Sequence, residues 1–218
     1  MTMSFINKTN VRDIAPEILD TDGKLKLLTA AEYDNYSYEE RRLFCHFYGR
    51  YCLPTKELID YLKNELEGTV IEIGAGHGDI AKHLGIHATD KKIQEIPEVK
   101  ATYDLMRQPV INYPDDIEKL DAIEAVAKYE PRVVIAAWVT TYAPKPTYFQ
   151  SSPYGVNEQE LLKWIKKFIL IGTDSIHGDK PICALPHRRE FMPWLQSRAK
   201  EQQDNCIFTW WNNENNII

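Results

Sequence analysis

The chain has 218 residues, of which 44% are apolar and 27% are charged, and its net charge at pH 7 is −6. This composition predicts one globular domain with a substantial core and room for an appendage. An acidic chain lacks the general attraction to phosphate backbones, which disfavours nucleic acid as a partner without excluding it. The sequence has no long apolar run and no charged-then-apolar leader, so we expect a cytoplasmic protein with no membrane partner.

The cysteines and histidines predict neither a metal centre nor a disulfide framework. The four cysteines stand apart among apolar neighbours, and none forms a Cys-x-x-Cys pair. The six histidines show no ligand spacing; His83 and His87 are separated by Gly85 and a predicted strand start. We therefore expect free thiols and no bound metal.

Residues 1–52 are predicted to form an N-terminal arm and helical extension, and residues 53–218 the main domain. Asp22-Gly23 indicates a turn in the arm, and Ser37 stands three residues before Glu40, the spacing of a helix capping box. A second helix is expected to restart at Thr55 and to end at Gly68.

The stretch from Thr69 to Ile80 predicts a buried strand, a glycine turn and a helix. Gly74, Gly76 and Gly78 alternate after the strand, whereas a dinucleotide fingerprint places its third glycine three positions after the second. This spacing argues against a nicotinamide-dependent oxidoreductase. No lysine of the phosphate-binding type follows the loop, which favours a ligand without phosphates.

Asp90 ends the next predicted strand, at 86–89. A carboxylate at the end of a second strand can accept hydrogen bonds from both hydroxyl groups of a ribose. The loop and this acid therefore predict together a nucleoside-containing ligand, although Asp90 could also be a simple turn residue.

The rest of the chain continues the alternation of strands and helices that is typical of α/β proteins. The expected strands are 110–113, 132–139 (central), 168–172 and 206–211, with 182–185 as an optional extra; the expected helices are 98–106, one capped by Asp121, one capped by Asn157, and 187–200. Only one clear strand is therefore predicted after 168–172. Residues 140–157 form a long loop of the kind that often covers a substrate.

Asp174 and His177 follow strand 168–172 and are expected at the carboxyl edge of the sheet, where open α/β sheets bind ligands. The ordinary pKa of histidine suits proton removal near neutrality, so His177 is the first candidate for a general base. Asp174 is the second candidate.

The pattern acid-x-Gly-x-Gly-x-Gly at Glu72–Gly78 resembles motif I of class I S-adenosylmethionine (SAM)-dependent methyltransferases. Segments around Leu53-Pro54-Thr55, Pro131–Trp138, Ile171-Gly172 and the tryptophan-containing tail extend this similarity to a branch of small methyltransferase-like proteins, over about residues 50–211. The resemblance implies an α/β fold with a Rossmann-like, doubly wound, mostly parallel sheet. It implies SAM as cofactor but brings no acceptor with it.

The resemblance also assigns residues to the two ends of the site. The acidic end of the first strand would lie near the SAM ammonium group, and an acid after the third strand would contact the adenine amino group, with Asp116 preferred to Asp115. The full expected cofactor set is Glu72, Gly74, Ala75, Gly76, His77, Gly78, Asp90 and Asp116. Trp138, Thr140 and Tyr142 follow the central strand and would contact substrate, with Tyr142 a third catalytic candidate.

The sequence thus predicts a SAM-dependent methyltransferase acting on an unidentified small molecule or protein group. The amino-methylating signature Asn/Asp-Pro-Pro-Tyr/Phe is absent after the central strand, and Ser152-Pro153-Tyr154 is displaced into the loop. This absence motivates the alternative, a binding or regulatory protein with the same fold and no methyl transfer.

Overall fold

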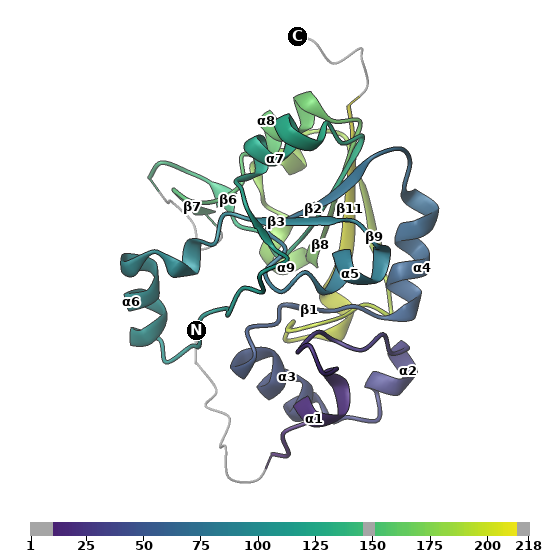
Figure 1. Cartoon of the computed structure of the whole chain (residues 1–218). Helices are drawn as coiled ribbons and strands as arrows, with labels where there is room; N and C mark the ends of the chain where they lie inside the picture. The colour runs from purple at the N-terminus through teal and green to yellow at the C-terminus, as the bar shows by residue number, and fades with distance from the viewer. Residues whose placement is uncertain (1–10, 146–150, 213–218) are drawn as a thin grey trace.

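The computed structural model describes residues 11–145 and 151–212, which form a mixed α/β fold around one central sheet (Figure 1). This sheet has seven strands in the order β4-β3-β2-β5-β8-β11-β9. The strands are β2 (Val70–Ile73), β3 (His87–Asp90), β4 (Glu118–Lys119), β5 (Val133–Ala137), β8 (Lys167–Thr173), β9 (Arg188–Phe191) and β11 (Asn205–Trp211).

The sheet is mostly parallel, and its strand order reverses next to β2. Strands β4, β3, β2, β5 and β8 pair in parallel, whereas β11 runs antiparallel to both β8 and β9. The chain leaves β2 toward one edge through β3 and β4, and then returns to the other side of β2 as β5. The carboxyl ends of β2 and β5 therefore flank a switch point, where open α/β sheets bind ligands.

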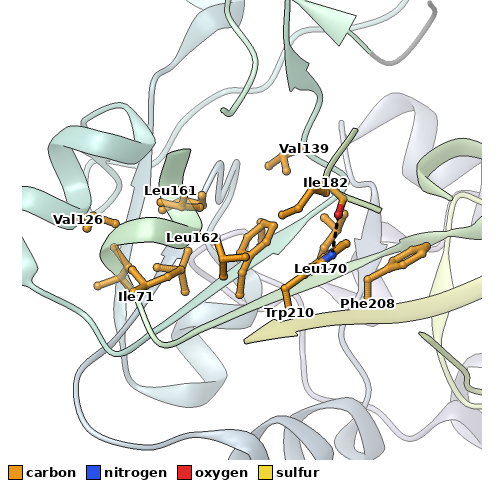
Figure 2. Close-up of a cluster of buried hydrophobic side chains, with 14 of the residues drawn as sticks. Ile71, Val126, Val139, Leu161, Leu162, Leu170, Ile182, Phe208 and Trp210 are labelled. Carbon is orange, nitrogen blue, oxygen red and sulfur yellow. Dashed lines mark hydrogen bonds between the residues drawn. The ribbon is translucent and has the colours of Figure 1, made fainter. Parts of the chain in front are cut away.

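Helices cover both faces because alternate residues of the buried strands point to opposite sides. On one face, α7 (Ala122–Tyr129) and α8 (Glu158–Trp164) pack on a cluster that includes Ile71 and Leu170. Figure 2 shows this cluster, in which the indole N–H of Trp210 donates to the carbonyl of Ile182 at 3.1 Å. On the other face, α4 (Lys56–Glu65) and α5 (Asp79–Leu84) pack on the alternate strand residues, which include Val70 and Ile169.

Several helix starts follow their local sequence signals. Asp121 caps α7 with a full capping box, and Asn157 accepts the N–H of Glu160 at the start of α8. Thr55 caps α4, which ends at Glu65, three residues before the predicted stop at Gly68. Short polar side chains at these positions satisfy backbone donors that the first helical turn leaves free.

The N-terminal extension folds on the carboxyl edge of the sheet. It comprises α1 (Ala15–Ile18), α2 (Ala30–Tyr33), the capping-box helix α3 (Tyr38–Phe47) and β1 (Cys52–Leu53), which pairs with β10 (Gln196–Ser197). Its buried residues form a small cluster of their own that includes Ile18, Tyr33 and Phe44. In Figure 1 this purple region lies at the end of the sheet where β11 begins, opposite the C terminus.

The predicted strand at 110–113 is wrong. The third parallel strand is β4, and residues 110–113 form no regular element. Pro109 and Pro114 flank the segment and cannot donate to a ladder, and the N–H of Ile111 is taken by the side chain of Gln94 at 2.7 Å. The segment instead crosses the carboxyl edge, where Ile111 packs beside Gly49 and Gly76.

The predicted last helix at 187–200 is also wrong, because this stretch supplies β9 and β10. Pro193 lies in its middle, where a helix would lose a hydrogen bond, and Arg188–Phe191 pairs instead with β11. Residues 182–185 add no strand either, because Pro181 begins the 3-10 helix η3 (Pro181–Ala184). The sheet therefore has two strands after β8 where only one was clear from sequence.

The remaining elements are short and lie near the carboxyl edge or around it. They are η2 (Ile93–Glu95), α6 (Pro97–Leu105), β6 (Thr141–Tyr142), β7 (Ser151–Ser152), α9 (Asp174–His177) and η4 (Gln202–Asp204). Strands β6 and β7 pair within the long 140–157 loop, of which 146–150 lie outside the described residues. Over the described ranges, no helix is both long and apolar enough to cross a bilayer.

Candidate functional site

The glycine loop between β2 and α5 lies at the switch point of the sheet. Gly74, Gly76 and Gly78 all have left-handed backbones, with φ of 57°, 57° and 69°. A Cβ on Gly74 would stand 2.5 Å from Val139, and one on Gly78 would stand 2.5 Å from Ile117. The turn therefore needs glycine for both its conformation and its close packing. Gly74 and Ala75 remain half-exposed.

Glu72 points from β2 to the start of α5 and is almost fully buried. Its Oε2 accepts the N–H of Ala81 at 2.8 Å, so a strand residue caps the helix that Gly78 cannot cap. Burial raises the pKa of Glu72 to about 8. The hydrogen bond to Ala81 shows that Glu72 holds the start of α5 in place. The sequence predicted only a cofactor contact for this residue.

Asp90 links the glycine loop to the end of β3. One carboxylate oxygen accepts the N–H of Gly76 at 2.9 Å, and the other accepts the N–H of Lys92 at 2.6 Å. The backbone joins the same elements, because Ala75 donates to the carbonyl of Thr89 at 3.0 Å. Burial raises the pKa of Asp90. The side chain of Tyr113 also hydrogen-bonds this carboxylate, so three of its four acceptor positions are used and one remains for a ligand hydroxyl group.

Asp79 anchors the N-terminal extension to the glycine loop, a role that sequence reasoning missed. Its Oδ1 accepts the N–H of Leu25 at 2.8 Å, and its Oδ2 lies 3.1 Å from Nε of Arg50. Asp79 and Arg50 are 7% and 4% exposed, so this ion pair is screened little by water. The only sequence signal was the position of Asp79, where a dinucleotide fingerprint would have glycine.

Lys24 makes a second connection from the extension, and it engages two predicted cofactor residues. Its Nζ donates to the carbonyl of His77 at 2.6 Å and lies 3.1 Å from both carboxylate oxygens of Asp116. The side chain of His77 is half-buried beside Gly49. Asp116 is thus paired with a lysine that the sequence gave no reason to place there. Asp115, its alternative, is exposed.

Trp138 directly follows the central strand β5 and has a strained backbone conformation. Its φ is +58°, which is unusual for a bulky residue and often marks a functional position. Its indole N–H is buried and has no hydrogen-bond partner among the described residues. The ring lies 6.2 Å from that of Tyr51, which the extension contributes, and 5.2 Å from that of His177. Trp138 therefore joins the extension, β5 and α9 at one point.

The structure places His177 inside the protein rather than at an open surface. The residue is 0% exposed, and burial lowers its pKa to about 3, so the ring is neutral at pH 7. Its Nδ1 lies 3.0 Å from the backbone nitrogen of Thr173 and 3.2 Å from the carbonyl oxygen of the same residue, and its Nε2 has no hydrogen-bond partner among the described residues. The ring is therefore enclosed and held by the backbone of Thr173, which favours a structural role. Asp174 forms an ion pair with Arg189.

A buried ion pair fixes the segment after β5, and sequence reasoning missed it too. Nζ of Lys180 lies 2.5 Å from Oε1 of Glu158, and it also donates to Thr141 Oγ1 and to the Val139 carbonyl at 2.9 and 2.8 Å. The two charged side chains are 0% and 2% exposed. Burial lowers the pKa of Lys180. No periodic pattern marks either residue in the sequence.

The other two predicted substrate residues lie on this fixed segment. The carbonyl of Thr140 accepts the N–H of Val156 at 2.8 Å, which ties the start of the long loop to its end. Tyr142 lies on β6 and is 45% exposed, so its phenol faces water. Of the predicted substrate residues Trp138, Thr140 and Tyr142, Trp138 has a buried side-chain nitrogen without a partner at the carboxyl end of β5.

Ile111 covers Gly76, the middle glycine of the loop, in this conformation. A Cβ on Gly76 would lie 3.4 Å from Cδ1 of Ile111, so this side chain rests on the loop. Two shallow hollows flank α5, but neither is lined by Asp90 or Trp138. A molecule that contacts Gly76 would therefore have to displace Ile111. Within the described part of the chain, no group of three or more potential ligands could hold a metal ion.

No protein-family model matches this chain, and no curated protein shows significant similarity to it. The geometry alone therefore carries the functional argument. It combines a glycine-rich turn, a carboxylate with remaining acceptor capacity, and an unpaired indole donor around one switch point. Such a site can bind a nucleoside and orient a second molecule beside it.

Proposed function

We propose that the chain is a class I SAM-dependent methyltransferase with a Rossmann-like, doubly wound sheet. The observation that carries the proposal is the left-handed three-glycine turn at the carboxyl end of β2, backed by Asp90. The strand order supports it, because the strands on either side of β2 follow the doubly wound arrangement and two further strands close the sheet after β8.

The residues present fit SAM at its nucleoside and amino-acid ends. Gly74 and Ala75 are partly exposed, and Asp90 retains one acceptor position for a ribose hydroxyl group. Bound SAM would supply an electrophilic methyl group. The role of the protein is to hold the acceptor in line with that methyl group and to exclude water. Many methyl transfers depend more on this alignment than on a strong base. Trp138 would orient the acceptor through its free indole N–H.

Titration calorimetry with SAM and S-adenosylhomocysteine tests the proposal. We expect binding of both, weakened by at least tenfold in Asp90→Asn, because the amide places an N–H group where an acceptor faces Gly76 or Lys92. Asp60→Asn is the matched control, since Asp60 lies on α4 outside the proposed site, with a side chain that is 75% exposed and 4.0 Å from its ion-pair partner Lys63. Absence of binding at millimolar ligand would refute the proposal.

The second candidate is a protein of the same fold that binds the cofactor without methyl transfer. The burial of His177 and the pairing of Asp174 with Arg189 favour it, because neither predicted base is free to act. Incubation with methyl-labelled SAM and a broad panel of small molecules and peptides separates the two candidates. A labelled product supports the enzyme, whereas tight binding with no product over the whole panel supports the binding protein.

A further inference from the structure

One segment at the carboxyl edge differs from the rest of the fold in how little of it is buried. Helix α6 has nine residues and none of them is buried. Leu105 and Met106, at its end, are 86% and 45% exposed although both are apolar. Few buried contacts mean a low free energy of local opening, so this segment can separate from the domain without disturbing the core.

Two left-handed residues bracket this segment. Lys92 and Arg107 have φ of 55° and 52°, and neither is glycine. Backbone changes in domain and lid movements concentrate in a few residues at the ends of elements. Lys92 begins η2 and Arg107 follows α6, so the two strained positions lie where hinges would be. Residues 92–107 are called the lid segment below.

Both ends of the lid segment touch the proposed cofactor site. The N–H of Lys92 is held by Asp90, the same carboxylate that holds Gly76 of the glycine loop. Beyond the other end, Ile111 covers Gly76, and its N–H is bound by Gln94 from within the lid segment. A ligand that binds Asp90 and displaces Ile111 would therefore act on the lid at both ends.

A pair of tyrosine hydroxyl groups joins the lid segment to the body. The hydroxyl oxygens of Tyr103, on α6, and Tyr51, on the N-terminal extension, lie 3.3 Å apart. Gln94 donates to Tyr103 at 3.2 Å, and Gln108 donates to Tyr51 at 3.1 Å. The ring of Tyr51 in turn approaches that of Trp138, at the acceptor end of the proposed site.

We infer that residues 92–107 form a lid over the carboxyl edge, latched by the Tyr51–Tyr103 hydroxyl pair, and that Asp90 couples its hinge to ligand binding. The latch belongs to the free protein, whereas the coupling rests on the proposed function. In the closed state the lid brings Tyr103 over the acceptor end and excludes water from it. In the open state the segment carries Ile111 away from Gly76 and admits ligand.

Hydrogen exchange of the α6 amides in the free protein tests the latch. Tyr103→Phe removes one hydroxyl and should speed exchange in 97–106 about fivefold, equal to about 1 kcal/mol at 1.4 kcal/mol per tenfold. Tyr51→Phe should give the same change, and the double variant no more than either single one. Tyr129→Phe is the control, because Tyr129 ends α7 and its hydroxyl donates to Glu118 on β4 rather than to a residue of α6. Unchanged exchange in Tyr103→Phe would overturn the latch.

Stopped-flow measurement of S-adenosylhomocysteine dissociation tests the coupling. We expect ligand to protect 97–106 in the wild type and to leave about fivefold faster from Tyr103→Phe than from Tyr129→Phe. Binding with equal dissociation rates and no added protection would overturn the lid while leaving the cofactor assignment intact. A failure to bind at all would overturn the proposed function and the coupling together, and the exchange of the free variants would still decide the latch.

Discussion

The buried carboxyl group of Glu72 makes the stability of the fold depend on pH in an unusual direction. Burial raises its pKa from the ordinary 4.5 to about 8, so the folded protein holds a proton that the unfolded chain releases above pH 4.5. The stabilisation is complete below pH 4.5 and is lost as pH rises toward 8. Carboxyl groups that are stabilised in their charged form make the fold more stable as pH rises. The contribution of Glu72 has the opposite sign and can therefore be distinguished from theirs.

The magnitude follows from the two pKa values. Between pH 5.5 and 7.5 the folded state binds almost one more proton at Glu72 than the unfolded state does. At 1.36 kcal/mol per pKa unit this lowers the free energy of unfolding by about 2.5 kcal/mol over the interval. Glu72→Gln carries no proton but retains an oxygen that can accept the N–H of Ala81, so it lacks this dependence.

Urea unfolding at the two pH values measures the effect. Relative to wild type, Glu72→Gln should gain about 2.5 kcal/mol on going from pH 5.5 to 7.5. Glu67→Gln is the control, because it makes the same chemical change at a half-exposed surface carboxylate and should show no such gain. Equal pH dependence of wild type and Glu72→Gln would refute the reasoning and would mean that the carboxylate is charged in the fold.

Two further substitutions test the packing of the site. Gly74→Ala places a Cβ 2.5 Å from Val139 at positive φ, whereas Gly85→Ala at similar φ meets nothing within 4 Å. Thermal unfolding should therefore show a loss of about 1 kcal/mol for Gly85→Ala and a clearly larger one for Gly74→Ala; equal losses would contradict the close contact. Lys180→Met leaves Glu158 buried without its cation and should cost about 3–5 kcal/mol in urea unfolding, with much of it restored by adding Glu158→Leu.

Local sequence signals were sufficient to predict the elements that depend only on residues close to one another in the chain. The capping box at Ser37, the helix cap at Asp121 and the apolar run of β5 all predicted their elements, because each depends on residues within one turn or one strand. The wrong predictions at 110–113 and 187–200 both concern segments that contain or adjoin proline. Their final form depends on distant partners, Gln94 for the first and β11 for the second.

The same division applies to the candidate site. The glycine loop and Asp90 lie on consecutive elements, so their proximity followed from the order of strands. Lys24 reaches the loop from 53 positions away, and Lys180 reaches Val139 from 41. Neither lysine has neighbours in the chain that reveal its partner. Contacts of this range depend on the tertiary packing and could not be read from spacing.

The two ends of the proposed site are built to different rigidity, and this has a consequence for function. At the cofactor end, Glu72, Asp79 and Asp90 fix the glycine loop from three elements before any ligand arrives. Preorganisation of this kind lowers the entropy lost on binding. At the acceptor end, helix α6 of the lid segment contributes no buried residue, and the segment closes through a hydroxyl pair. Changes at the cofactor end should therefore alter affinity and stability together, whereas changes in the lid should alter rates of exchange and release while the fold keeps its stability.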